Sequence, residues 1–253
     1  RRKSAIISLF GDRNMSHSYN YQLNFWDEQD NGVRILLEHV HQGIQSCKTM
    51  EHFFEERCKL EKDYSRRLGA IADKFDKSLS TNPDYGKLLQ SLKLFQETQG
   101  RIAKAHSIQA IHIHTQNYKE LRSFISDLMA KYTTIDGKVR SLRSDKITKR
   151  QLCSELKEKL AKATVELRDC QLNQLNKLGV KESSANEKQL SKWSSIVEEL
   201  QIKIDVLQQE YKASTQHWFQ EWAELSLELQ NMEEQRIHFM KAKMQEYTGA
   251  VME

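Results

Sequence analysis

The chain of 253 residues contains a single proline, Pro83, and only nine glycines. Proline removes a backbone donor and clashes with the preceding turn, and glycine costs up to about 1 kcal/mol relative to alanine inside a helix. A chain with so few of both permits helices far longer than the roughly three turns usual in globular domains. Helices of that length must bury their apolar stripes along one another, and usually along a second copy of the chain.

The composition agrees with this expectation. Charged residues make up 29% of the chain, aromatic residues 8% and hydrophobic residues 38%, a mixture typical of long helices and coiled coils. We therefore expect an all-α protein, and no membrane span, because no run of about 18 apolar residues occurs. Residues 5–10 form a short apolar run without a small-residue cleavage site, so 1–18 is interpreted as a flexible N-terminal arm rather than a signal peptide.

The first long helix is predicted from the spacing of its apolar residues. Asp27 is a plausible cap, and an apolar stripe follows from Val33 to Phe75 in steps of three, four and seven, which is the period of one helix face. The stretch 78–84 ends this helix in a short turn, because Pro83 excludes the residue before it from the helical region.

Two further helices are expected after the turn. The segment from about 85 to 178 has no proline, and Gly100 and Gly137 are its expected bend points. Gly179 predicts its end, since glycine adopts the left-handed C′ conformation without steric cost. The last helix is expected to start at 183–186, and its stripe consists of Trp193, Val197, Leu200, Ile204, Leu207, Tyr211, Trp218, Trp222, Leu225, Leu229 and Met232.

Nothing in the sequence favours catalysis. The glycines are isolated, so no nucleotide-binding loop is present. Histidines two residues apart, as in His39/His41 and His112/His114, point roughly 200° away from each other on a helix and cannot share a metal ion. The cysteines at 47, 58, 153 and 170 lie at or beside stripe positions and are interpreted as reduced core residues of a cytoplasmic protein. We expect no enzyme activity, no cofactor and no metal.

Basic side chains are the strongest candidates for binding. Residues 138–150 hold six basic residues and one acid, a net charge of +5 that exceeds the +4 of the whole chain. An elongated stripe of one sign suits an anionic phospholipid surface, nucleic acid or an acidic protein. Membrane is favoured over nucleic acid because single-strand binders interleave aromatic residues with the basic ones, and this stretch has none. An adaptor that docks an acidic protein without binding lipid stays open as the alternative.

The candidate lipid-binding residues are Arg140, Arg143, Lys146, Lys149 and Arg150, together with Arg57, Lys62, Arg66 and Lys74 on the first long helix. The basic residues of that first helix are interspersed with acids and fit a solvated face almost as well. The candidate core or dimer residues are Phe54, Tyr64, Leu68, Trp193, Tyr211, Trp218 and Trp222.

Several motifs occur in the order and spacing of a known family. They are Phe25-Trp26-Asp27, Asn31-Gly32-Val33, Phe53-Phe54-Glu55-Glu56-Arg57, Leu60-Glu61-Lys62-Asp63-Tyr64, Glu210-Tyr211-Lys212, Trp218 and the run from Met232 to Ile237. This pattern resembles the F-BAR domain, most closely that of fungal proteins of the cytokinetic ring and septum, over about residues 19–248. Glu55 and Asp73 stand where some relatives have lysine, which shifts the expected lipid contact toward 140–150.

The resemblance implies an elongated bundle of three long helices with a short N-terminal helix, paired as an antiparallel homodimer. The F-BAR domain is expected to occupy 19–253, with the C-terminal part of the family domain truncated. The implied function is a scaffold that binds anionic phospholipids (phosphoinositides or phosphatidylserine) at the plasma membrane of the division site and links it to the actin machinery. Expected partners are the second copy, further dimers joined end to end and cytokinetic ring proteins, without nucleic acid.

Overall fold

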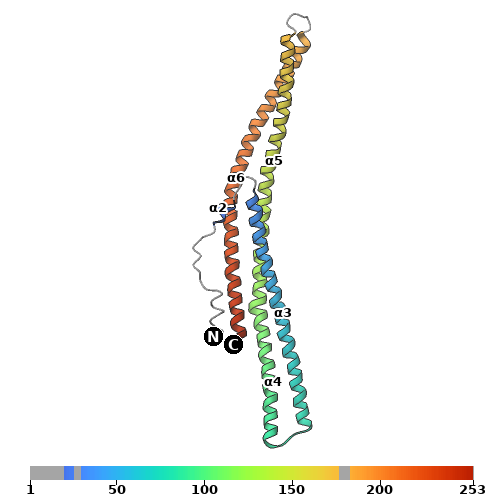
Figure 1. The fold of residues 1–253 in the computed structure, drawn as a ribbon, viewed down its shortest axis with the longest axis vertical. Helices are drawn as coiled ribbons and strands as arrows, with labels where there is room; N and C mark the ends of the chain where they lie inside the picture. Colours follow the sequence, from blue (N-terminus) through green and yellow to red (C-terminus); the bar gives the residue numbers. More distant parts are fainter. Residues whose placement is uncertain (1–19, 26–29, 177–182, 253) are drawn as a thin grey trace. The chain divides into compact units, whose positions relative to one another are not determined.

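The computed structural model describes residues 20–25, 30–176 and 183–252, and all of their regular structure is helical (Figure 1). The elements are α2 (Tyr21–Asn24), α3 (Asn31–Thr81), α4 (Gly86–His112), the π-helix η1 (Ile113–Lys119), α5 (Glu120–Asn176) and α6 (Ser183–Met252). The predicted all-α architecture of three long helical runs and a short N-terminal helix is confirmed. The predicted arm at 1–18 and the predicted stop at Gly179 lie outside the described residues. Asp27 lies outside them too, but the first long helix begins at Asn31 with Asp30 as its N-cap, so the predicted cap at Asp27 is corrected.

The predicted helix boundaries agree closely with the structure. The turn at 78–84 separates Thr81, the last residue of α3, from Gly86, the first residue of α4. The last helix begins at Ser183, as its sequence predicts. Among the described residues, no helix has an apolar stretch long enough to cross a bilayer.

The chain divides into two compact units, which we describe separately. Unit 1 comprises Arg1–Thr133 and Ser226–Glu253, and unit 2 comprises Thr134–Leu225. In unit 1, α3 and α4 are connected by the turn at 82–85 and pack along each other (Figure 1). Its apolar core includes Val33, Leu36, Ile44, Phe54, Ile113, Leu121 and Leu229, each at most 1% exposed.

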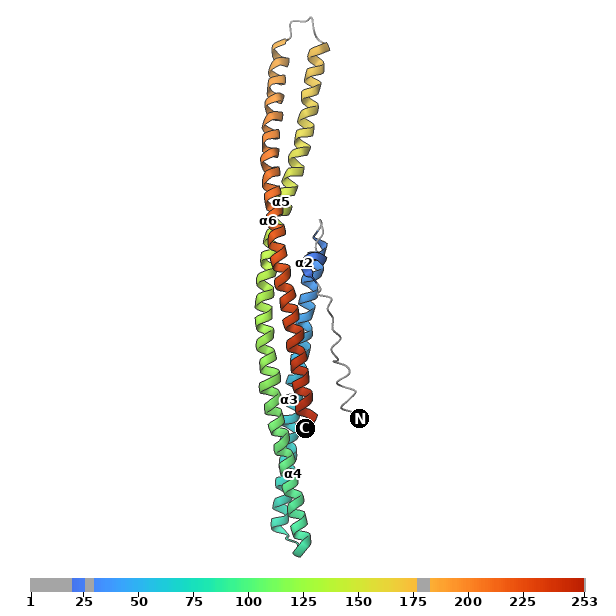
Figure 2. The same cartoon turned by 90° about the vertical axis from the view of Figure 1, so that its left-hand side faces the viewer.

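Unit 2 is an antiparallel pair formed by residues 134–176 of α5 and 183–225 of α6 (Figure 2). Lys138 Nζ lies 2.5 Å from Glu221 Oε2, and the Ser214 hydroxyl donates to Asp145 at 2.5 Å. The two contacts are seven residues apart on each helix, which fixes the register. Val139, Ile204, Trp218 and Trp222 are buried in this unit at no more than 2% exposure.

The long central run departs from α-helical geometry at Ile113–Lys119, and not at the glycines where bends were predicted. Gly100 and Gly137 lie within α4 and α5, with open space around the position of a Cβ. Successive buried residues here are Ala110, Ile113, Asn117, Leu121 and Ile125, so three steps of four follow one another. Each step of four advances an α-helical stripe by about 40°, and the wider π-helical turn offsets this drift. The α-helix continues through both glycines, so bending at those positions stays a prediction, and the departure from α-helical geometry at Ile113–Lys119 is a feature the sequence interpretation missed.

Gly32 permits a close backbone contact at the start of α3. A Cβ at this position would lie 2.7 Å from the carbonyl carbon and oxygen of Phe25, a distance that backbone atoms cannot relieve without moving. Asp30, just before the helix, is buried and has a left-handed backbone with φ 59°. The start of α3 therefore lies against the backbone of Phe25, in a position that only glycine at residue 32 permits.

Gly32→Ala is expected to destabilise the protein by about 1–3 kcal/mol, because the added methyl group overpacks a backbone contact. Chemical denaturation followed by circular dichroism measures the change. Gly100→Ala is the matched control: its Cβ meets nothing within 4 Å, so it should be neutral or stabilise the protein by up to about 1 kcal/mol. Equal effects of the two substitutions would contradict the proposed contact.

Candidate functional site

The six basic residues of 138–150 do not form one free stripe in the structure. Lys138 pairs with Glu221, Arg140 pairs with Asp136 at 2.8 Å, and Lys149 pairs with Asp145 at 2.9 Å. The net charge of +5 predicted for 138–150 includes Asp145 but not Asp136 or Glu221. These two acids lie outside that range of residues and neutralise part of its charge. Arg140 nevertheless keeps 79% of its side chain exposed.

Lys146 points inward. It is 7% exposed, and its ammonium nitrogen lies 5.4 Å from the centre of the Trp218 ring, a cation–π arrangement. Such a placement withdraws Lys146 from an external anionic surface. Arg143 is half-buried, and Arg150 is exposed with no carboxylate at ion-pair distance among the described residues.

The polar contacts at Asp145 also shape the electrostatics of unit 2. The hydrogen bond from Ser214, followed by that from Lys149, lowers the pKa of the Asp145 carboxyl below its usual value. The hydrogen bond from Lys138 lowers the pKa of Glu221 in the same way. Both carboxylates therefore stay charged at neutral pH. Their contacts are seven residues apart on each helix, so they lie at the same edge of the α5–α6 pair.

The four candidate residues on α3 differ in their availability. Arg57 pairs with Glu61 and donates from Nε to the Tyr247 hydroxyl at 3.2 Å, so it is held inside unit 1. Arg66 pairs with Asp63 at 2.5 Å but stays 75% exposed. Lys62 and Lys74 are exposed, and neither has a carboxylate at ion-pair distance among the described residues.

Glu61 is a buried charge that the sequence interpretation missed. Its side chain is 3% exposed and lies between Arg57 of α3 and His106 of α4, whose Nδ1 is 2.6 Å from Glu61 Oε2. The Tyr64 ring packs edge-on against His106, with ring centres 4.4 Å apart. A buried carboxylate needs such partners to offset its lost hydration, and this cluster joins α3 to α4.

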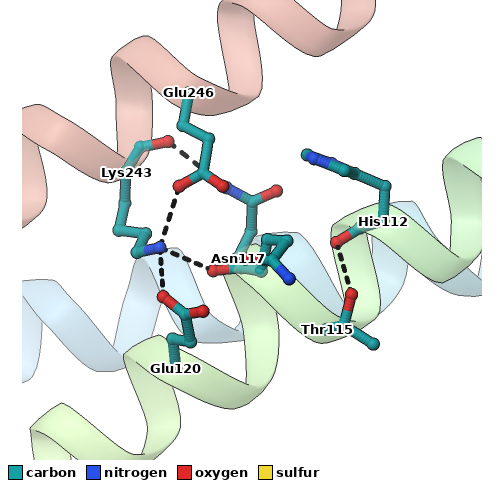
Figure 3. A network of polar contacts seen from close by, with 7 residues as sticks. His112, Thr115, Asn117, Glu120, Lys243 and Glu246 are labelled. Atoms are coloured by element: carbon teal, nitrogen blue, oxygen red, sulfur yellow. Dashed lines mark hydrogen bonds and ion pairs between the residues drawn. The ribbon is translucent and has the colours of Figure 1, made fainter.

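A second buried polar network centres on Lys243 of α6 (Figure 3). Its ammonium group donates to the Gln116 carbonyl at 2.8 Å, to Glu246 at 2.8 Å and to Glu120. The Asn117 amide returns a hydrogen bond to the Lys243 carbonyl at 3.4 Å. Burial alone would lower the pKa of Lys243, but the hydrogen bonds to Glu120 and Glu246 raise it above its usual value. The reciprocal bonds connect η1 with α6.

The predicted core or dimer residues fall into two groups. Phe54, Trp218 and Trp222 are each 1% exposed, and the two tryptophan rings stack 5.7 Å apart. Leu68, Trp193 and Tyr211 are half-buried, whereas Tyr64 is 48% exposed. Burial within one chain therefore accounts for the first group and leaves part of the second accessible to a partner.

The placements of His39 and His41, and of two of the four cysteines, agree with the predictions. His39 faces Glu233, whereas His41 lies against the Tyr132 ring. All four cysteines are free thiols; Cys47 and Cys153 are buried, whereas Cys58 and Cys170, which were also expected in the core, are half-buried. The one group of potential metal ligands found among the described residues, His52, Glu55 and Glu56, is on the surface, and Lys59 pairs with both of its carboxylates.

Comparison with known proteins identifies the fold and family. A family model described as the Fes/CIP4 and EFC/F-BAR homology domain matches residues 32–108. Cytokinesis protein 2 of Saccharomyces cerevisiae is 46% identical over 236 residues, which are 93% of this chain and 35% of that protein. The crystal structure of the Hof1p F-BAR domain matches with a TM-score of 0.85 and 46% identity, covering 93% of this chain and 86% of that one.

The structure of the Imp2 F-BAR domain matches with a TM-score of 0.80 at 21% identity, over 92% of this chain and 76% of that one, and shows the fold alone. The helical architecture and these matches together define an F-BAR domain. The chain belongs to the F-BAR family, as its motifs predict. It spans between 25% and 35% of the length of the first curated relatives it matches.

Proposed function

We propose that this chain is a dimeric membrane-binding module that holds a scaffold against anionic phospholipid at the site of cell division. The observation that carries the proposal is the 46% identity, over 93% of the chain, to a yeast protein named for cytokinesis. The mechanism is adhesion through surface cations, and no step of it requires bond-making chemistry.

Exposed cations in both units support lipid binding. Lys62 and Lys74 in unit 1 and Arg150 in unit 2 have exposed side chains without a carboxylate partner among the described residues, and Arg140 and Arg66 are largely exposed beside theirs. Each lysine or arginine close to an anionic leaflet contributes about 1 kcal/mol. Several such residues on each of two chains would give appreciable binding. Lys146 and Arg57 are left out of the proposed contact set because each is engaged inside its unit.

An exposed apolar stripe on α3 supports self-association. Phe53, Leu60, Tyr64 and Ile71 follow in steps of seven, four and seven, and their exposed fractions are 47%, 59%, 48% and 62%. The apolar stripe predicted from Val33 to Phe75 includes Ile71, and its exposure corrects the expectation that it is buried. Residues at this spacing lie on one face of a helix, and several large apolar side chains left exposed on one face are characteristic of an interface. A second copy of the chain is the occupant we propose.

The experiment is co-sedimentation with phosphatidylcholine vesicles that contain or lack phosphatidylserine. The combined change Arg140→Glu, Arg143→Glu and Arg150→Glu is expected to abolish binding to the anionic vesicles, because three charge reversals remove the attraction and add repulsion. Sedimentation velocity should show the same oligomeric state for the variant and the unmodified protein.

Two outcomes would count against the proposal. If the unmodified chain binds neither vesicle type, the lipid-binding function is wrong. The alternative, an adaptor that binds an acidic protein, is then favoured. If the triple variant binds with unchanged affinity, these arginines are not the contact residues.

A further inference from the structure

The register of unit 2 places a lysine of α6 beside the basic residues of α5. The pairs Lys138–Glu221 and Asp145–Ser214 both have residue numbers that add to 359. Ile147 and Lys212 add to the same total, so Lys212 lies across from Ile147 along the antiparallel pair. Lys212 is exposed and has no carboxylate at ion-pair distance among the described residues.

Helical phase determines which edge of the pair these residues occupy. Arg143 and Ile147 are each two residues from Asp145, and Lys212 is two residues from Ser214, which corresponds to about 160° around the helix. Asp145 and Ser214 meet at one edge of the pair. Arg143, Ile147 and Lys212 therefore lie at the other edge, and Arg150, three residues after Ile147, lies there as well.

The acids of this region are on the Asp145 side. Between 140 and 154 the acid is Asp145, and between 206 and 220 it is Glu210. Glu210 is four residues from Ser214, within about 40° of it around α6, so it shares that side. On the Lys212 side the nearest acids are Asp205, two turns away along α6, which accepts a hydrogen bond from Gln201, and Asp136, two turns before Arg143 on α5, which pairs with Arg140. Between 140 and 154 of α5 and between 206 and 220 of α6, the acids therefore lie at one edge of the pair, and Arg143, Arg150 and Lys212 lie at the other.

We propose that Arg143, Arg150 and Lys212 form a lipid-binding edge that spans both helices of unit 2, with Ile147 at its centre. Ile147 is 42% exposed, so a large apolar side chain stands among three cations. This combination fits the headgroup layer of an anionic bilayer, where phosphates meet the cations and the apolar side chain enters between lipids. The inference rests on the proposed function and adds α6 to its contact surface.

Lys212→Glu tests the edge in the full chain, by co-sedimentation with phosphatidylcholine–phosphatidylserine vesicles. It is expected to weaken binding by at least about tenfold, because the charge is reversed next to the bilayer. Lys192→Glu is the matched control: it makes the same change on the same helix, and twenty residues place it about 200° away from Lys212. This control should bind within about twofold of the unmodified chain.

Two further variants serve as controls, one for misfolding caused by the charge reversal and one for a purely electrostatic effect. Lys212→Gln, which only neutralises the charge, should weaken binding by about fivefold. Ile147→Ser should weaken it by about threefold without changing its dependence on salt, since it removes apolar contact and no charge.

The outcomes distinguish a failure of the proposed lipid-binding edge from a failure of the proposed membrane-binding function. If the unmodified chain binds these vesicles and Lys212→Glu behaves like Lys192→Glu, the edge is wrong while the membrane function stands. If the unmodified chain does not bind, both fail. If Lys212→Glu leaves vesicle binding intact but abolishes binding of a single-stranded oligonucleotide, the edge serves nucleic acid and our assignment is overturned.

Discussion

Trp218→Ala is expected to destabilise unit 2 by about 3–5 kcal/mol, the usual range for removing a large buried aromatic side chain. Trp218 is 1% exposed, stacks on Trp222 and carries the Lys146 ammonium group over its ring. The substitution leaves a cavity and also exposes Lys146 to an interior without its aromatic partner. Urea unfolding followed by circular dichroism, at one fixed protein concentration, measures the loss.

Trp193→Ala is the matched control for this measurement. Trp193 lies on the same helix in the same unit but is only half-buried, so its removal should cost clearly less. Should the two substitutions cost the same, or Trp218→Ala cost under about 1 kcal/mol, the tryptophan stack would not be the core of unit 2.

Lys243→Ala is expected to destabilise unit 1 by about 2–4 kcal/mol. Removing one member of a buried polar network leaves the others without a partner, here the Gln116 carbonyl and the carboxylates of Glu120 and Glu246. We place the value below that of a fully buried ion pair because the two carboxylates are 47% and 34% exposed and can recover some hydration.

Lys243→Met separates packing from charge. It keeps most of the apolar stem and removes the donor, so it should recover only part of the loss. Thermal unfolding and amide hydrogen exchange across 113–120 provide the measurements, and exchange there should accelerate in both variants. A methionine variant as stable and as protected as the unmodified chain would show that the ammonium group contributes nothing to the contact.

The sequence was sufficient for the features that depend on local chemistry. Pro83 and its neighbours predicted the end of α3, and the alternating steps of three and four in the last helix predicted its buried face, including Trp218 and Trp222. Both predictions are correct because a helix end and a buried helix face each depend on residues that are close together in the sequence.

The features that escaped prediction depend on residues far apart in the chain. Glu61 and Lys243 are charged, and although Arg57 and Glu246 on their own helices pair with them, their burial also needs His106, Gln116 and Glu120, which lie far away in the sequence. Lys146 was predicted to be part of the exposed basic stripe. In the structure its ammonium group lies over the ring of Trp218, a residue 72 positions later in the chain. The π-helix does have a local signal in the sequence: the polar Asn117 lies in a series of core positions spaced by four residues. The positions of the glycines carry no information about it.

That π-helical turn has a consequence for how such a chain can tolerate change in length. In a continuous α-helix, one inserted residue rotates everything beyond it by about 100° and turns the buried stripe outward. Ile113–Lys119 already contains the equivalent of such an insertion, absorbed within seven residues. The helix before it and the helix after it can each keep its own apolar face inward. Length variation along this run is therefore best accommodated at η1, where the winding of the helix is already altered.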